Sequence, residues 1–320
     1  MEGSYTPAMT EPAPRLLGTL LGDYWFWRRE HLPSAALVDL LREFGLSESA
    51  ARAAIQRAAG RGLVVTSKNG RRTAYGVPAR THRLVIGHLR RLLEFGAGDR
   101  NWDGRWTFAM FSVPEARRED RRTLRSRLRW LGFGPLYDGV WVSPWDRADD
   151  ALHVLHTLGV GTATVTRAEV SRSTPEAGNP LHAWDLRALR QAYADFIDRY
   201  ARVRERVCAG DVGPRQALVE RTRIMTEWRE FPDTDPDLPA ELLPADWPRL
   251  HARRCFLDVY DALGPVAEQR FRQVVAQHAP ELAELAAHRT STDITRGAPE
   301  DPATLADDEE LDWAGPLGRQ

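Results

Sequence analysis

Residues 34–77 constrain the fold more than any other stretch, because they contain signals for two helices, a tight turn and a hairpin in succession. Ser34 can cap the first helix, and Ser47 can cap a second helix over 48–59. The Lys68-Asn69-Gly70 sequence then indicates a tight turn between two short strands. This order of elements is typical of a winged helix-turn-helix, in which the second helix enters the major groove of DNA.

The second of these helices has an unusually thin apolar side. Winding it at about 100° per residue brings Ala51, Ile55, Ala58 and Ala59 together and leaves a polar, cationic outer face. This face is suited to base edges, and the basic hairpin can hold phosphates beside it. The candidate DNA-binding residues are Ser49, Arg52, Gln56, Arg57, Lys68, Arg71 and Arg72. A small α+β domain that binds protein, or no partner, remains the alternative.

Charge is divided unevenly along the chain. Residues 1–130 carry 23 Arg and Lys against 13 Asp and Glu, whereas residues 131–320 carry 21 against 32. A basic front joined to an acidic back indicates nucleic-acid contact on one side only, although the net charge is −1.

The same sequence favours a particular compartment. Cys208 and Cys255 are the only cysteines and show no disulfide or metal-binding spacing, which fits a reducing environment. No apolar run reaches the roughly 18 residues of a membrane span, and the N-terminus lacks the apolar core of a signal peptide. We therefore expect a cytoplasmic protein without membrane contact.

The chain divides into segments of distinct pattern. Residues 101–172 have the order strand, helix, two strands, helix, strand, which is the βαββαβ pattern of a ferredoxin-like domain. The predicted fold is α+β and multidomain, with a winged helix-turn-helix, a central ferredoxin-like domain and a helical C-terminal domain. The predicted segments are a disordered N-terminus at 1–14, the winged helix-turn-helix at 15–78, a linker helix at 79–100, the ferredoxin-like domain at 101–172, the helical domain at 180–286 and a disordered acidic tail at 287–320.

One helix of the C-terminal domain carries a regular apolar seam. Between Leu186 and Val207 the apolar positions are spaced alternately three and four residues apart, which is a heptad pattern. The seam predicts either the core of the domain or a dimer interface, and the sequence leaves both open.

Enzymatic chemistry has little support in the sequence. Small CRISPR-associated ferredoxin-like proteins include metal-dependent nucleases, but such a site needs a carboxylate at the end of the first strand, where this chain has Phe111-Ser112-Val113. His153 and His156 share a helix face without an obvious third ligand. We therefore expect no catalytic residues, no metal and no cofactor, with a nuclease or nucleic-acid-processing protein as the alternative.

Several short motifs in fixed order carry a family resemblance. They are Gly22-Asp23-Tyr24-Trp25, Ser49-Ala50-Ala51-Arg52, Gly60-Arg61-Gly62-Leu63, Leu131-Gly132-Phe133-Gly134, Gly139-Val140-Trp141-Val142-Ser143-Pro144 and Asp235-Pro236-Asp237-Leu238-Pro239. With these motifs the chain resembles the PaaX family of bacterial transcriptional repressors over roughly residues 15–280. Arg249 departs from the pattern, because a glycine is expected there.

The resemblance implies a three-domain homodimeric repressor. Such a protein would bind a palindromic double-stranded operator, control phenylacetate or related aromatic catabolism, and be released by an aryl-CoA thioester such as phenylacetyl-CoA. The effector-binding residues do not transfer with the motifs. We expect an apolar slot lined by aromatic residues of the back half, with arginines of 117–129 and 199–206 near the phosphates.

Overall fold

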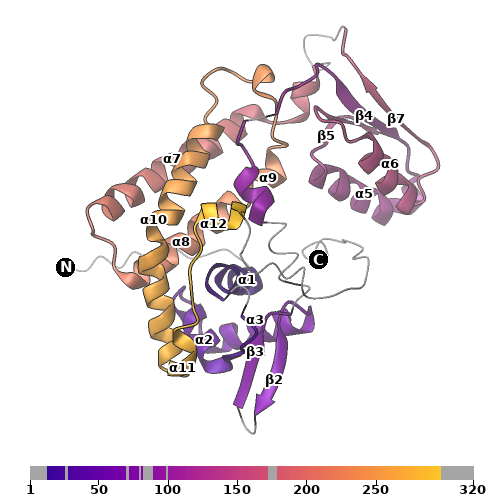
Figure 1. The fold of residues 1–320 in the computed structure, drawn as a ribbon. Coiled ribbons are helices and arrows are strands. Elements are labelled where there is room, and N and C mark those ends of the chain that lie inside the picture. The colour runs from indigo at the N-terminus through magenta and orange to yellow at the C-terminus, as the bar shows by residue number, and fades with distance from the viewer. Residues whose placement is uncertain are drawn as a thin grey trace.

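The computed structural model describes residues 13–25, 28–69, 72–78, 81, 89–98, 100–171 and 179–296. Within them, helices and two antiparallel sheets form an N-terminal unit, a central unit and a C-terminal helical part (Figure 1). None of the helices described has the length and hydrophobicity that a membrane crossing requires.

The N-terminal unit follows the predicted order of elements. Its elements are α1 (Ala13–Tyr24), β1 (Leu32–Pro33), α2 (Ser34–Arg42), α3 (Glu48–Gly60), β2 (Val65–Asn69) and β3 (Arg72–Gly76), with the sheet order β1-β3-β2. Ser47 caps α3, since its side chain accepts a hydrogen bond from Ala50 N over 3.2 Å. The expected cap at Ser34 is wrong: Pro33 precedes α2 and Ser34 is its first residue, without a capping hydrogen bond. Asn69 pairs with Arg72, so β2 runs into the expected turn.

The central unit has the predicted succession of strands and helices. It contains β4 (Trp106–Phe111), the short helix η1 (Glu115–Arg117), α5 (Arg118–Trp130), β5 (Gly134–Tyr137), β6 (Val140–Ser143), α6 (Ala148–Thr157) and β7 (Ala163–Ala168). The antiparallel sheet has the order β5-β6-β4-β7, and α5 and α6 cover one of its faces (Figure 1). In the tight turn between β5 and β6, Gly139 has a φ of 75°, and a Cβ there would lie 2.6 Å from Phe111 O. Glycine is therefore required at this turn.

The C-terminal part consists of helices and short connecting turns. They are η2 (Pro180–Ala183), α7 (Leu186–Cys208), α8 (Pro214–Trp228), α9 (Phe231–Thr234), η3 (Ala240–Leu242), α10 (Arg249–Ala276), α11 (Pro280–Ala283) and α12 (Ser291–Arg296). The heptad seam of α7 is internal: Leu189, Tyr193, Phe196 and Tyr200 are all at most 6% exposed within the single chain. The structure thus selects the core alternative for this seam over the dimer interface.

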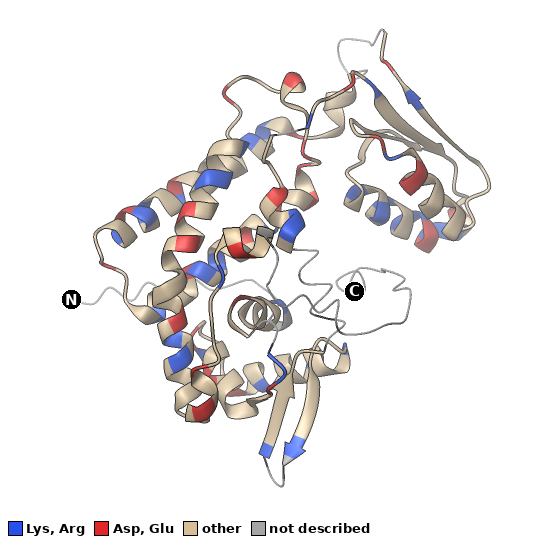
Figure 2. Ribbon diagram, viewed as in Figure 1, with Lys and Arg blue, Asp and Glu red and all other residues tan. Residues whose placement is uncertain are grey.

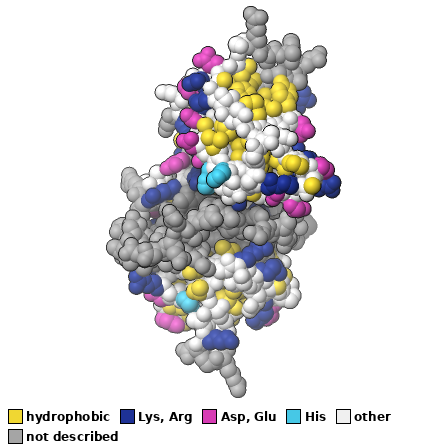
Figure 3. Space-filling view, turned by 90° about the vertical axis from the view of Figure 1, so that its right-hand side faces the viewer, with side chains coloured by type: hydrophobic (Ala, Val, Ile, Leu, Met, Phe, Trp, Pro, Cys, Tyr) yellow, Lys and Arg dark blue, Asp and Glu magenta, His cyan; other side chains and the backbone are white. Residues whose placement is uncertain are grey.

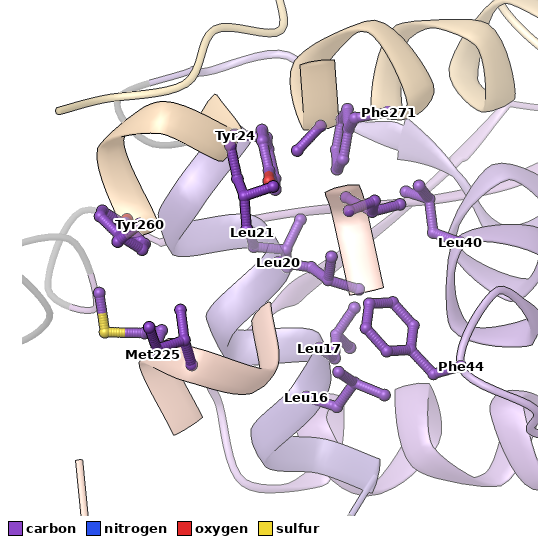
Figure 4. Packing of buried hydrophobic residues seen from close by; sticks show 14 of the residues in the cluster. Leu16, Leu17, Leu20, Leu21, Tyr24, Leu40, Phe44, Met225, Tyr260 and Phe271 are labelled. Carbon is purple, nitrogen blue, oxygen red and sulfur yellow. The ribbon is translucent and has the colours of Figure 1, made fainter. Parts of the chain in front are cut away.

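One hydrophobic core joins the N-terminal unit to the C-terminal helices. Leucines of α1 and Phe44 belong to the same cluster as Met225, Tyr260 and Phe271 (Figure 4). The central unit has a separate core between its sheet and its two helices. The predicted winged and helical domains are therefore not independent of each other.

Two predicted boundaries need correction. α1 already begins at Ala13, inside the segment 1–14 that was expected to be disordered. Ordered structure also continues to residue 296, because Ala287 N donates to Tyr24 O over 3.1 Å and Ile294 of α12 is buried. Residues 1–12 and 297–320 lie outside the described residues, as do residues 79–80, 82–88 and 99 of the expected linker helix at 79–100, of which residues 81 and 89–94 are helical.

Candidate nucleic-acid interface

The outer face of α3 is exposed as the sequence predicted. Ala51, Ala54, Ile55 and Ala58 are buried against the N-terminal unit, whereas Ala59 is only half-buried. The exposed residues of the helix include Ser49, Arg52, Ala53, Gln56 and Arg57. Small and polar side chains thus alternate on a face that the rest of the described chain leaves uncovered.

The four candidate side chains of α3 differ in their contacts. Arg52 Nε and Nη2 donate to Glu48 Oε1 over 3.0 and 2.7 Å, which holds this guanidinium along the helix. Gln56 Nε2 donates to the hydroxyl of Tyr75 in β3 over 3.1 Å, and Ser49 Oγ lies 3.1 Å from Ser47 Oγ. Among the described residues, no hydrogen bond or ion pair engages the guanidinium of Arg57, which is exposed. Arg57 is therefore the candidate whose donors are available to a base edge.

The hairpin carries a basic residue on each of its two strands (Figure 2), and the strand register places these two residues on opposite faces. Lys68 pairs with Thr73, and Arg72 pairs with Asn69. Because side chains alternate along a strand, Lys68 shares the face of the buried Tyr75, toward the helices, and Arg72 lies on the other face. Lys68 and Arg72 are both exposed, and Arg71 lies outside the described residues.

A buried polar joint connects α1 to the C-terminal helices. Tyr260 OH donates to Asp23 Oδ1 over 2.8 Å, and Arg221 Nη1 lies 3.7 Å from Asp23 Oδ2. Arg221 also donates to the carbonyl oxygens of Tyr260 and Arg289, over 3.0 and 2.6 Å. Burial raises the pKa of Asp23, and the guanidinium of Arg221 counteracts this effect. The joint fixes the helix that underlies α3 to the rest of the molecule.

Two surface contacts reinforce this joint at α2 and the residue after it. His278 Nε2 lies 2.8 Å from Asp39 Oδ2, within hydrogen-bond distance. Arg270 donates to both carboxylate oxygens of Glu43, over 2.8 and 3.2 Å. α2 and the turn after it are thus tied to α10 and to the residues that follow α10.

A second joint, which the sequence analysis missed, links the central unit to the C-terminal part. Tyr193 OH donates to Asp235 Oδ2 over 2.7 Å, and Arg249 Nη1 lies 3.2 Å from the same oxygen. Trp145 Nε1 of the central unit donates to the carbonyl oxygens of residues 236 and 237, both at 3.1 Å. Arg249, the departure from the expected family pattern, is 7% exposed and anchors this segment. The dense Asp and Pro content of 232–239 was the only signal for this joint.

Several aromatic side chains of the C-terminal part, which were candidates for lining the expected effector slot, are buried in the core. They stack on one another: Trp228 and Phe256 have ring centroids 5.0 Å apart, and those of Tyr193 and Phe231 lie 4.3 Å apart. In α7, Arg204 and Arg206 lie near Asp258 and Asp211 as ion pairs. These aromatic rings and these two arginines are therefore already engaged within the chain.

The alternative of a metal-dependent nuclease needs carboxylate ligands in the central unit. β4 ends at Phe111, before Ser112, so no carboxylate stands at the end of this strand. Within the described ranges, no three His, Cys, Asp or Glu side chains are grouped so that they could hold a metal ion, and this includes the surroundings of His153 and His156. The N-terminal unit is therefore the candidate site.

The chain matches three family models in succession, which together define a multidomain PaaX architecture. They are described as "PaaX-like protein" at residues 13–81, "PaaX protein central Cas2-like domain" at 99–179 and "PaaX-like protein C-terminal domain" at 184–273. The chain belongs to the PaaX family.

Two known proteins are similar over most of the chain. The transcriptional repressor PaaX of Escherichia coli (strain K12) is 26% identical over 261 residues, which are 79% of this chain and 80% of that protein. The solved structure of an uncharacterized protein, Rv0674, from Mycobacterium tuberculosis is similar in fold, with a TM-score of 0.50 and 24% identity over 82% of this chain and 98% of the other.

Proposed function

We propose that this protein is a DNA-binding transcriptional repressor whose N-terminal unit works as a winged helix-turn-helix. The observation that carries the proposal is the uncovered outer face of α3 with Gln56 and Arg57, beside a hairpin with basic residues. In this function α3 lies in the major groove and the hairpin contacts the sugar-phosphate backbone. The central unit, with its strand order β5-β6-β4-β7, fits a ferredoxin-like fold. In sequence it stands between the DNA-binding N-terminal unit and the C-terminal helices.

The proposed repressor controls aromatic catabolism and is released by an aryl-CoA thioester. The E. coli relative is a repressor, and the family resemblance supplies the effector class. An effector can release DNA only if it binds the DNA-competent and the released conformations with different affinities. Such a difference requires the three parts of the chain to shift against one another, and the polar contacts of Asp23 and Asp235 lie where these parts meet.

The test begins with an operator selected from a pool of random duplexes. Its affinity for the full-length protein is measured with phenylacetyl-CoA, and with free phenylacetate as the control. Release by the thioester and not by the acid is expected. If neither compound changes the operator affinity, the effector assignment is wrong while DNA binding stands; if no duplex is enriched, the repressor function is wrong.

The proposed repressor is a homodimer on a palindromic operator. One α3 helix would contact only a few base pairs. A dimer that binds two half-sites about one turn of the DNA helix apart forms a tight and specific complex. The apolar seam of α7 is buried within the chain, so the dimer must use another surface. Sedimentation of the protein on a full operator and on an isolated half-site measures the stoichiometry.

A further inference from the structure

Two pairs of arginines in η1 and α5 differ in the contacts of their side chains. Arg117 donates to the carbonyl oxygens of Leu158 and Gly159, and Arg121 donates to Val113 O, so these side chains hold the central unit together. Arg125 and Arg129 follow Arg121 by one and two turns of α5, and they line a cavity of about 250 Å³. Basic side chains gather along the lower edge of the central unit, where Figure 1 places α5, next to hydrophobic atoms (Figure 3).

The cavity lies between α5 and the β5–β6 hairpin. Its apolar lining comes from Pro135, Leu136 and Tyr137 of the edge strand β5 and from Trp141 of β6. Trp141 is 2% exposed, and the guanidinium of Arg129 lies over its ring, 5.3 Å from the centroid. This contact holds the guanidinium in place before any ligand arrives, which lowers the entropy lost on binding.

Arg125 has unused hydrogen-bonding capacity in the cavity. Its Nε is buried and has no hydrogen-bond partner among the described residues. Its Nη2 lies 3.3 Å from Asp138 Oδ1, which is a long contact to a side chain that is 98% exposed. A buried donor without an acceptor is unfavourable, and an oxyanion would satisfy it while the exposed Asp138 turns to solvent.

We propose that this cavity binds the oxyanion of a small organic molecule, either a phosphoryl or a carboxylate group. Two guanidinium groups side by side present planar pairs of donors that match both kinds of oxyanion. Leu136 and Tyr137 would contact the adjoining carbon skeleton. The volume of about 250 Å³ is below the roughly 300–1,000 Å³ of pockets for whole drug-sized ligands. The cavity therefore holds one group of a larger ligand, or a ligand of one ring.

The test uses the full-length protein without DNA. Inorganic phosphate, phenylacetate and adenosine 3′,5′-bisphosphate are titrated separately by calorimetry into the wild type and into the Arg125→Gln and Arg129→Gln variants. Arg122→Gln is the matched control, because Arg122 is exposed on the same helix and does not line the cavity. Thermal melting of each variant establishes that it is folded.

At least one probe is expected to bind, and each cavity substitution should weaken it by about tenfold while Arg122→Gln leaves it unchanged. Absence of binding by all three probes at millimolar concentration overturns the proposal, and so does an equal loss in the control. If the cavity substitutions weaken only duplex DNA and not the small probes, the surface belongs to DNA and the proposal also fails. Because the titrations contain no DNA, their result is independent of the proposed repressor function.

Discussion

At the scale of single residues, Arg57 and Arg52 show how two similar side chains on one helix can differ in availability. Both are exposed on α3, but only Arg52 is held by Glu48 through two hydrogen bonds. A guanidinium that already has a carboxylate partner must give it up before it can bind a guanine edge. The sequence made both residues candidates for DNA binding, and the contacts separate their expected roles.

Arg57→Ala is expected to weaken binding to the selected operator by about 1–3 kcal/mol, because a bidentate contact to a base is lost. Binding to an unrelated duplex should change much less. Arg52→Ala is the matched control and should cost less at the operator. Competition binding with both duplexes measures the difference. An equal loss on both duplexes for Arg57→Ala would mean that this residue contacts phosphate instead of a base.

At the scale of elements, the hairpin places Lys68 and Arg72 on opposite faces of β2 and β3. Only the Lys68 face is shared with Tyr75, whose hydroxyl accepts a hydrogen bond from Gln56 of α3. Lys68 therefore lies on the hairpin face that is turned toward α3, and a phosphate bound beside α3 would meet Lys68 before Arg72. The sequence predicted phosphate contact for Lys68 and Arg72 alike, because their charges can be read from the sequence but the faces on which they lie depend on the pairing of the strands.

Lys68→Ala should accordingly weaken all duplexes to a similar degree and reduce the slope of log affinity against log salt concentration by about one. Arg72→Ala should change this slope less. Binding isotherms at several salt concentrations provide the measurement. If the two substitutions change the slope equally, the hairpin tip is inserted in a groove with both faces in contact with DNA.

How far the sequence predicts elements depends on whether the signal is local. The cap at Ser47, the Asp138-Gly139 hairpin and the succession of strands in the central unit follow from residues a few positions apart, and the structure has them. The α7 seam shows that one face of a helix is apolar, but the covering helices come from elsewhere in the chain. The pairing of Asp235 with Arg249 could not be predicted either, because a charged residue carries no local mark of its distant partner.

At the scale of the whole molecule, the buried contact between Asp23 and Arg221 makes the stability of the N-terminal unit depend on α8 and α10. Asp23 is 3% exposed and Arg221 is fully buried. Removing one member of a buried charge pair leaves the other without compensation, which costs much more than removing both.

Arg221→Met is expected to lower the free energy of unfolding by about 3–5 kcal/mol at neutral pH. The Asp23→Leu/Arg221→Met double variant should recover a large part of this loss. Burial already raises the pKa of Asp23, and without Arg221 it rises further. Protonation then favours the folded state, so the deficit should shrink as pH falls through the folded-state pKa toward the ordinary aspartate value of about 3.9.

Denaturant unfolding of the wild type, of Arg221→Met, of Asp23→Leu and of the double variant across this pH range measures the coupling between the two residues. Additive losses in the double variant, or a deficit that grows on acidification, would show that the two charges do not act as a pair.

The shared core also sets the order in which a newly synthesised chain can mature. The N-terminal unit is synthesised first. Phe271, whose ring stacks on that of Tyr24 with centroids 5.0 Å apart, is added nearly 250 residues later. Until α8 and α10 emerge, the leucine-rich side of α1 has no cover from these helices, and the nascent polypeptide exposes apolar surface that favours aggregation or chaperone binding. Translation that stops before α10 therefore releases no stable DNA-binding fragment, so a truncated product does not compete with the complete protein for its operator.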